Sequence, residues 1–498
     1  MSKYSAAVLL LIFAVVLSVR LYFAFSTLYF TSDDSYFHLR QVEHIQDTGK
    51  PIFDDALSYS GRAFIFNPVF HYIIAFFSLF MPLTIAAKLL PNIFAASLIF
   101  FIYLISKKIT KSTNVALFTA FLSGFVPVFF AETATRLTPV SLAIPLIFLL
   151  IYAFMNIGST FWLYCYLAVL VLLSFLHPIV SLFVLGLFIY LILVRVESLK
   201  QSRDEIEVSI FSIFFILWAQ FIIYKKPLLY HGLSVVWQNI PKDVLSEHFA
   251  ATTTLGAIYQ IGLIPFVIGL YVIYLFLFKK KQKDIYLIMA FAASAGLLLW
   301  LRFIELKIGL MFFGLVLVVL FSQGYLQFVE IVKKSKVSRF LWLFAALIFA
   351  AFLVLSVYPS IALAQKESQS ITPDEINALE WIKSNTPPQA TIVATVNEGS
   401  MVTAIAQRKN VMDSSFLMQR DVAERFNDLK RIYTTTLEVE AVGLMDKYGA
   451  DYIYFSGKAR AYFKTDKIRY ADGKCFLKVY DDHVQVYKKL PECRVKTV

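Results

Sequence analysis

Charged residues are scarce in this sequence. Lys, Arg, Asp and Glu make up 16% of its 498 residues, whereas soluble domains contain about 25%. Hydrophobic residues reach 59% and include 49 Phe and 27 Tyr. So much apolar surface does not fit one soluble core, which excludes a soluble enzyme, a nucleic-acid-binding protein and a disordered protein. The composition predicts a polytopic α-helical membrane protein.

Cysteine is also rare, and the three cysteines lack the spacing of a metal site. Cys165 lies in an apolar run. Cys475 and Cys493 fall in the C-terminal region, where they either pair, if that region is extracytoplasmic, or remain two free thiols.

Apolar runs long enough to span a membrane, about 20 residues in a helix, recur along the first 361 residues. A further apolar run at 64–82 is ambiguous between another span and a segment that lies on the membrane surface. We expect about eleven spans, at 5–30, 88–106, 114–131, 137–156, 161–176, 179–194, 208–224, 256–278, 285–301, 307–329 and 340–361.

The positive charges resolve this ambiguity, because Lys and Arg gather in cytoplasmic loops. If 64–82 lies on the surface, every basic cluster between spans shares one side: 107–111, 195–203, 279–283 and 333–339. The net charge of +12 therefore orients helices and gives no support to nucleic-acid binding. We expect a multi-pass plasma-membrane protein with a cytoplasmic N-terminus. Its outer face then holds the loops 31–66, 131–136 and 225–255 and the C-terminal domain.

The last 137 residues read as a water-soluble α/β domain, which gives two expected domains, 1–361 and 362–498. Thr372-Pro-Asp-Glu375 has the pattern of a helix capping box. The β-branched run 391–395 indicates a strand. We also expect helices near 419–432 and 437–448, and strands near 451–455, 475–480 and 483–488.

The first outer loop begins with two adjacent acids, Asp33 and Asp34, followed by His38 and Arg40. Charges beside a membrane are costly unless they are used. Carboxylates that face a polar cavity can hold a hard divalent cation or accept a proton. The alternative is an ordinary solvated helix end.

Beyond this pattern, Asp34-Ser-Tyr-Phe-His-Leu-Arg40, with the later Gly49-Lys-Pro51, Asp54 and Asn67-Pro68, resembles the first outer loop of the oligosaccharyltransferase catalytic-subunit family. The resemblance implies a membrane glycosyltransferase of the GT-C fold with about 11–13 transmembrane helices. It also implies a single-subunit enzyme of the archaeal and bacterial type, and it places the family's metal-binding catalytic Asp on Asp34.

Three later stretches carry the same resemblance. Val244-Leu-Ser-Glu247 is similar to the family's Thr-Ile-x-Glu motif, whose Glu helps to hold the metal and the acceptor. Arg302 resembles the family's Arg that contacts the donor phosphate. Gly399, with Arg408 nine residues later and Asp413 five residues after that, matches the segment that begins with the family's Trp-Trp-Asp-Tyr-Gly motif.

Two departures from the family pattern bear on the site. Where the family has Trp-Trp-Asp-Tyr-Gly, which recognises the Ser/Thr hydroxyl of an Asn-x-Ser/Thr acceptor, this chain reads Thr395-Val-Asn-Glu-Gly399. The candidate acceptor-binding residues are then Asn397, Glu398 and Gly399. The second outer loop lacks the expected acidic pair. Either Glu132 substitutes as a metal ligand or the site has fewer ligands, and Glu132 with Arg136 also fits an ordinary i,i+4 pair.

The resemblance implies that a sugar or oligosaccharide moves from a polyprenyl (dolichyl) phosphate donor to a protein or other acceptor on the outer face. A divalent cation, Mn²⁺ or Mg²⁺, at Asp34 and Glu247 would neutralise the leaving phosphate. The alternatives are a GT-C glycosyltransferase whose acceptor is a lipid, a glycan or Ser/Thr, and a non-enzymatic transporter or scaffold. The acids lie in outer loops and no repeat is visible, which does not favour a transporter.

Overall fold

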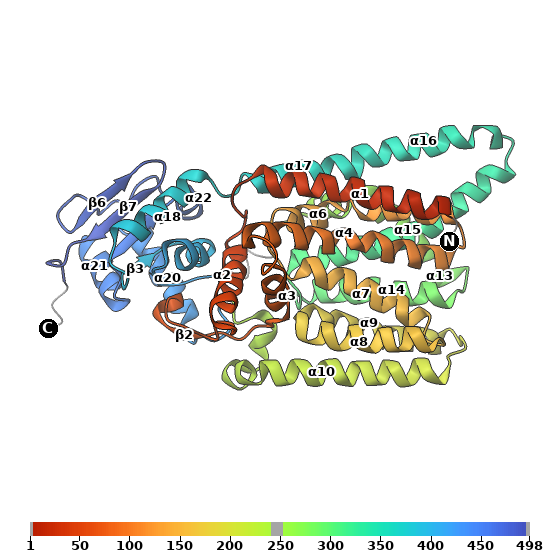
Figure 1. Cartoon of the computed structure of the whole chain (residues 1–498), viewed down its shortest axis with the longest axis horizontal. Helices are drawn as coiled ribbons and strands as arrows, with labels where there is room; N and C mark the ends of the chain where they lie inside the picture. Colours follow the sequence, from red (N-terminus) through yellow and green to blue (C-terminus); the bar gives the residue numbers. More distant parts are fainter. Residues whose placement is uncertain (1–2, 241–251, 495–498) are drawn as a thin grey trace. The chain divides into compact units, whose positions relative to one another are not determined.

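The structure is a computed structural model that describes residues 3–240 and 252–494 (Figure 1). These residues form two compact units. The first comprises the described residues within Met1–Leu28, Asn67–Tyr224 and His248–Ser368, and the second those within Tyr29–Phe66, Lys225–Glu247 and Gln369–Val498. The segment Tyr29–Phe66, which contains the predicted first outer loop, thus folds with the C-terminal region. The predicted boundary between the two functional domains, 1–361 and 362–498, stays a prediction.

Apolar helices build the first unit. Their bounds are α1 Lys3–Ser26, α3 Val69–Phe77, α4 Leu83–Thr110, α5 Thr113–Ser123, α6 Pro127–Ala134, α7 Val140–Met155, α8 Thr160–Leu176, α9 Ser181–Val196, α10 Arg203–His231 (which runs on into the second unit), α12 Thr254–Ile261, α13 Leu263–Phe278, α14 Lys283–Trp300, α15 Leu306–Lys334, α16 Leu341–Phe352 and α17 Tyr358–Ser368.

Each of the eleven predicted spans coincides with a helix or with helices that follow one another directly. By length and composition, seven helices among the described residues can span a membrane, or nine if each of two bent pairs is one span. The two remaining predicted spans are the shorter α7 and α8, with 16 and 17 residues. The prediction of a polytopic helical membrane protein is confirmed.

The ambiguous run 64–82 forms only α3, a helix of nine residues. At 1.5 Å per residue α3 is about 14 Å long, roughly half the hydrocarbon thickness of a bilayer. This length agrees with a segment that does not span the membrane.

Helix-on-helix packing holds the bundle together. The helix α14 packs against α9 and α15, α13 against α15, and α4 against α5 and α7. The helices α8 and α10 are joined by two hydrogen bonds. The Tyr166 and Ser212 hydroxyls lie 2.7 Å apart. The Gln220 side-chain amide donates to the Ser174 carbonyl across 2.7 Å.

The second unit contains both helices and strands. Its elements are α2 Asp33–Thr48, β1 Asp54–Asp55, η1 Ser58–Ser60, β2 Arg62–Ala63, η3 Gly232–Trp237, α18 Pro373–Asn385, β3 Thr391–Val393, η6 Val396–Glu398, α19 Gly399–Met401, η7 Val402–Ala406, β4 Lys409–Asn410, α20 Val422–Thr434, α21 Glu438–Lys447, β5 Tyr452–Phe455, α22 Gly457–Phe463, β6 Phe476–Asp481 and β7 Gln485–Lys489.

Five strands form the sheet of this unit, in the order β4-β3-β5-β7-β6. The strand β3 pairs in parallel with both β4 and β5, whereas β7 pairs antiparallel with β5 and β6. The predicted α/β domain, its capping box at Thr372 and Glu375 and its predicted strands are confirmed. The short strand β4 and the helix α22 were not expected.

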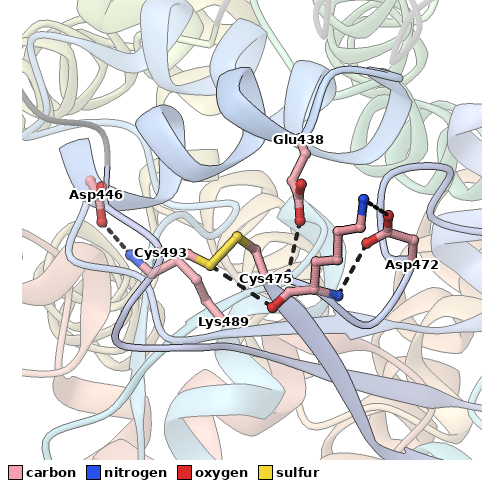
Figure 2. Close-up of a disulfide and its surroundings, with 7 residues drawn as sticks. Glu438, Asp446, Asp472, Cys475, Lys489 and Cys493 are labelled. Atoms are coloured by element: carbon pink, nitrogen blue, oxygen red, sulfur yellow. Dashed lines mark hydrogen bonds and ion pairs between the residues drawn. A yellow bond between two sulfur atoms is a disulfide. The ribbon is translucent and has the colours of Figure 1, made fainter.

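A disulfide joins Cys475 and Cys493 beside the β6–β7 hairpin (Figure 2). The backbone N–H of Cys475 donates to the Glu438 carboxylate across 3.0 Å, and Lys489 forms an ion pair with Asp446. Of the two alternatives left open by the sequence, the structure has the paired one.

Candidate functional site

The loop of residues 31–66, predicted to lie on the outer face, opens with α2, whose two ends are set by local sequence. Ser32 caps the N-terminus by accepting a hydrogen bond from the Ser35 N–H, and Gly49 ends the helix in the left-handed conformation with a φ of 73°. Asp33 and Asp34 lie in the first turn, where negative charge is favourable. The loop therefore presents its acids from a defined helix terminus.

The two adjacent carboxylates face different surroundings. Asp33 is buried, and its two oxygens accept hydrogen bonds from the backbone N–H groups of Ser400 and Met401, at 3.1 and 2.8 Å. Burial and the nearby Asp34 charge raise the pKa of Asp33 to about 8, although the Met401 and Ser400 donors act in the opposite direction. Asp33 is thus engaged by the protein itself.

Asp34, by contrast, is exposed. One of its carboxylate oxygens accepts a hydrogen bond from the Ser414 hydroxyl across 2.9 Å. Of the acid pair, Asp34 is the one whose position suits contact with an outside ligand.

The other polar candidates of this loop have less suitable surroundings. Arg40 binds Asp55 through two parallel hydrogen bonds of 2.6 and 2.8 Å. Burial alone would raise the pKa of Asp55, but its contacts with Arg40 prevail and hold it below its usual value. Loss of hydration lowers the pKa of His38 to about 3, so the imidazole is neutral at physiological pH.

The hairpin of β1 and β2 is held against the segment around Asp413. The Ser58 hydroxyl donates to the buried Asp413 carboxylate across 2.5 Å, and the Tyr59 N–H donates to the Asn410 side chain across 2.7 Å. Arg62 lies 3.8 Å from the same carboxylate. These contacts join the loop of residues 31–66 to the segment of residues 399–415, and no sequence pattern marked them.

The stretch that replaces the family's aromatic motif is mostly inaccessible. Glu398 is 1% exposed and accepts a hydrogen bond from the Thr395 hydroxyl across 2.6 Å. Burial raises the pKa of Glu398, against the opposing effects of Lys458 and nearby hydroxyls. Gly399 is buried as well, whereas Asn397 is exposed. Of the three predicted acceptor-binding residues, only Asn397 is placed to touch a ligand.

In the first unit, Glu132 belongs to a network of four charges. Its carboxylate forms ion pairs with Arg136 and with Lys307, the latter at 2.6 Å, and Arg136 also pairs with Glu367. Both Glu132 oxygens are therefore engaged by cations, which includes the i,i+4 pair with Arg136, and the role of Glu132 as a metal ligand stays a prediction. Arg136 is likewise occupied by carboxylates.

Arg302 lies in the connection between α14 and α15 and is exposed. Its φ of 58° is in the left-handed region, the usual conformation of the residue that follows a helix C-terminus, and the Phe303 N–H donates back to the Leu298 carbonyl across 2.9 Å. Glu247, the second predicted catalytic residue and metal ligand, lies outside the described residues. Asp34 and Arg302 belong to different units, so the structure describes each within its own.

The described residues do not form a metal centre by themselves. Among residues 3–240 and 252–494, no three or more His, Cys, Asp or Glu side chains are grouped to hold a metal ion. Asp34 supplies one exposed carboxylate, and Mg²⁺ is usually held by one or two carboxylates, while waters and substrate phosphate oxygens complete its octahedron. Asp34 can therefore be one ligand of the predicted cation, and its predicted partner Glu247 lies outside the described residues.

The bundle of apolar helices and the C-terminal α/β unit together have the fold of solved membrane glycosyltransferase structures. The oligosaccharyltransferase of Archaeoglobus fulgidus in the apo form has a TM-score of 0.70 at 15% identity and covers 93% of this chain and 71% of its own. ArnT from Cupriavidus metallidurans, bound to undecaprenyl phosphate, has a TM-score of 0.59 at 10% identity and covers 100% of both chains.

Two further structures of the archaeal enzyme match as well. One is a complex with Zn and sulfate, with a TM-score of 0.62 at 14% identity over 89% of this chain and 67% of the other. The second holds an inhibitory peptide and a dolichol-phosphate, with a TM-score of 0.58 at 15% identity over 93% and 71%. These likenesses confirm the predicted GT-C fold.

At the level of sequence, the dolichyl-phosphooligosaccharide-protein glycotransferase 2 of A. fulgidus is 34% identical over 137 residues. The matched stretch covers 26% of this chain and 23% of that relative, so it spans less than a quarter of the relative's length. No family model matches the chain.

Proposed function

We propose that this protein is a membrane glycosyltransferase that moves a sugar or oligosaccharide from a polyprenyl-phosphate-linked donor to an acceptor on the outer face of the plasma membrane. The observation that carries the proposal is the fold, which matches an oligosaccharyltransferase and ArnT over 93% and 100% of this chain. Their complexes with dolichol-phosphate and undecaprenyl phosphate favour a donor of the same chemical class.

The proposed reaction breaks the bond between the anomeric carbon and the phosphate oxygen and forms a bond to the acceptor nucleophile, with inversion. Asp34 is exposed at the start of α2, where its carboxylate can orient the acceptor and take up its proton. Arg302 binds the donor phosphate, because a planar guanidinium presents two N–H groups to phosphate and stays charged.

A divalent cation, Mn²⁺ or Mg²⁺, would be held by Asp34 together with Glu247, and it would neutralise charge on the leaving phosphate. The Zn complex of the archaeal relative supports a divalent ion of some kind. Glu132 is left out of this proposal because Arg136 and Lys307 occupy its carboxylate.

A second candidate function differs only in its acceptor. The structure of the archaeal relative tethered to an acceptor peptide that contains the NVT sequon favours a protein acceptor. The burial of Glu398 and Gly399 favours instead an acceptor other than an Asn-x-Ser/Thr peptide, because Asn397 alone of the three predicted residues is exposed. The acceptor would then be a lipid, a glycan or a Ser/Thr side chain.

We also propose that the N-terminus is cytoplasmic, that the C-terminal domain lies outside the cell and that one chain suffices for activity. The Cys475–Cys493 disulfide supports the outer position, since disulfides persist in oxidising surroundings. That one chain suffices is what the sequence resemblance to the archaeal and bacterial single-subunit enzymes implies.

The test uses the full chain in detergent micelles, with radiolabelled lipid-linked sugar extracted from the cells that carry the native chain. An Asn-x-Thr peptide is the acceptor in one arm and the envelope fraction of the same cells in the other. We expect sugar transfer in at least one arm and a loss of about 100-fold or more in Asp34→Asn.

The matched control is Asp47→Asn, which removes the same charge from an exposed position on the same helix. It should keep wild-type activity. Transfer in neither arm, or full activity of Asp34→Asn, would contradict the proposal, and the arm that responds identifies the acceptor class.

A further inference from the structure

Two consecutive acids at one helix terminus have opposite environments, and this contrast calls for an explanation. Asp33 is 8% exposed and Asp34 lies in solvent. Successive residues on an α-helix point about 100° apart, since one turn takes 3.6 residues. If the direction of the Asp33 side chain is fixed, the direction of Asp34 is therefore fixed as well.

The Asp33 carboxylate is fixed by two donors. The Ser400 and Met401 N–H groups belong to α19, which η7 continues, and the N–H groups of the first turn of a helix have no acceptor within the helix. They reach separate oxygens of Asp33, at 3.1 and 2.8 Å. Two donors on two oxygens of one carboxylate restrict both its position and its rotation.

The segment that carries these donors is itself anchored. The Asn410 side chain donates to the Gly399 carbonyl across 2.9 Å and to the Asp413 carboxylate across 3.2 Å. Asp413 is followed by Ser414, whose hydroxyl reaches Asp34. One continuous segment, residues 399–414, thus contacts both acids of α2.

We propose that Asp33 is a positioning residue that aims the Asp34 carboxylate by tying the first turn of α2 to the Ser400 and Met401 N–H groups. The inference rests on the proposed function, in which Asp34 does the chemistry. Asp33 does not itself react, because both of its oxygens already accept hydrogen bonds from the protein.

The experiment compares Asp33→Asn with Asp47→Asn and Asp34→Asn in the full chain, with the lipid-linked sugar extract as donor and the more active acceptor of the two. Asn can accept a hydrogen bond through only one of its two terminal atoms, so one of the two N–H partners is lost. We expect kcat to fall about 10- to 100-fold, since a misplacement of about 1 Å can cost 100-fold. The donor KM should stay within about twofold, and Asp33→Glu, which keeps both acceptors, should recover part of kcat.

Two outcomes would overturn the inference. One is an Asp33→Asn variant with the kcat of Asp47→Asn. The other is a lost kcat that tracks a matching loss of folded protein, measured as the apparent Tm, which would make the role of Asp33 merely structural. If Asp33→Asn does not accumulate in the membrane, Asp33→Glu decides the question, because unchanged kcat contradicts positioning and lowered kcat supports it. Full activity of Asp34→Asn would instead remove the proposed function itself.

Discussion

The Asn410 side-chain amide donates a hydrogen bond to the Gly399 carbonyl across 2.9 Å, and this contact depends on the absence of a side chain at Gly399. A Cβ at that position would lie 2.3 Å from the Met412 carbonyl oxygen and 2.5 Å from the Asp413 Cβ. The backbone of residues 399–401 can therefore lie directly on the backbone of residues 412–413. This close approach places the Ser400 and Met401 N–H groups beside α2.

Gly399→Ala should consequently destabilise the protein by about 3 kcal/mol, because the new Cβ meets backbone, which cannot swing aside as a flexible side chain can. We expect a lower apparent Tm and faster proteolysis of the hairpin at residues 54–63. Gly457→Ala is the control, since a Cβ at Gly457 meets nothing within 4 Å and should leave the Tm unchanged or slightly higher. Equal Tm values in the two variants would show that residues 399–401 can move away from residues 412–413 without loss of stability.

Glu398→Gln should change how stability depends on pH. Because burial raises the pKa of Glu398, the folded chain keeps this proton at pH values where the unfolded chain, with a pKa of about 4.3, has lost it. Stability therefore falls as the pH rises from about 4.3 through the pKa of the folded state. Gln has no such proton and can still accept the hydrogen bond from Thr395.

We thus expect the apparent Tm of Glu398→Gln to exceed that of the wild type at pH 8, by about 2–4 °C, and to approach it at pH 5. Thermal unfolding of the full chain in detergent measures this difference. Glu380→Gln, at an exposed position of α18, should follow the wild type at both pH values. A constant offset between Glu398→Gln and the wild type would argue against a buried, titrating carboxyl.

Removing the disulfide should also destabilise the chain. Cys475 and Cys493 are 18 residues apart, a loop for which a cross-link contributes about 3 kcal/mol. The free energy of unfolding should therefore fall by a similar amount in Cys475→Ser, in Cys493→Ser and in the double variant. Cys165→Ser removes the free cysteine of the described chain and serves as the control.

The same variants test orientation. After Cys475→Ser, a membrane-impermeant maleimide should label Cys493 in intact cells only if the C-terminal domain lies outside. Labelling that requires broken cells would place this domain in the cytoplasm and contradict the proposed orientation.

Sequence patterns predicted most of the fold because the signals were local. The capping box at Thr372 and Glu375, the β-branched run at β3 and the long apolar runs each depend on residues close together in the chain. The strand β4 has only two residues and exists because β3 lies beside it, so no pattern in its own sequence identifies it.

The candidate site was harder to predict because its contacts join distant residues. The family resemblance selected Asp34 from the acid pair, but no pattern in the sequence predicted how Asp33 is held, because its donors, the Ser400 and Met401 N–H groups, lie more than 360 positions away. Arg20 shows the same limit inside an apolar run. Its guanidinium is buried and donates to Asn92 and Thr133 at 3.1 and 2.6 Å, and neither partner is marked by any motif.

Substitution of Arg302 tests the proposed phosphate contact. If its guanidinium binds the donor phosphate through two N–H groups, Arg302→Lys keeps the charge but loses the planar fork. We expect the donor KM to rise about 10-fold in Arg302→Lys and about 100-fold in Arg302→Ala, in line with one and then two lost charge-assisted hydrogen bonds. The apparent Tm should stay near the wild-type value because Arg302 is exposed.

Lys280→Ala is the matched control for charge. Lys280 is an exposed cation in the same unit as Arg302. It belongs to a basic cluster that is predicted to lie on the cytoplasmic side. Its donor KM should equal that of the wild type. Dolichyl phosphate without sugar provides a second measurement, because it should inhibit the wild type competitively against the donor and inhibit Arg302→Ala far more weakly. If Arg302 contacts the phosphate directly, its removal must weaken the binding of that phosphate. An Arg302→Ala variant with an unchanged donor KM and unchanged inhibition would therefore assign the phosphate contact to another residue.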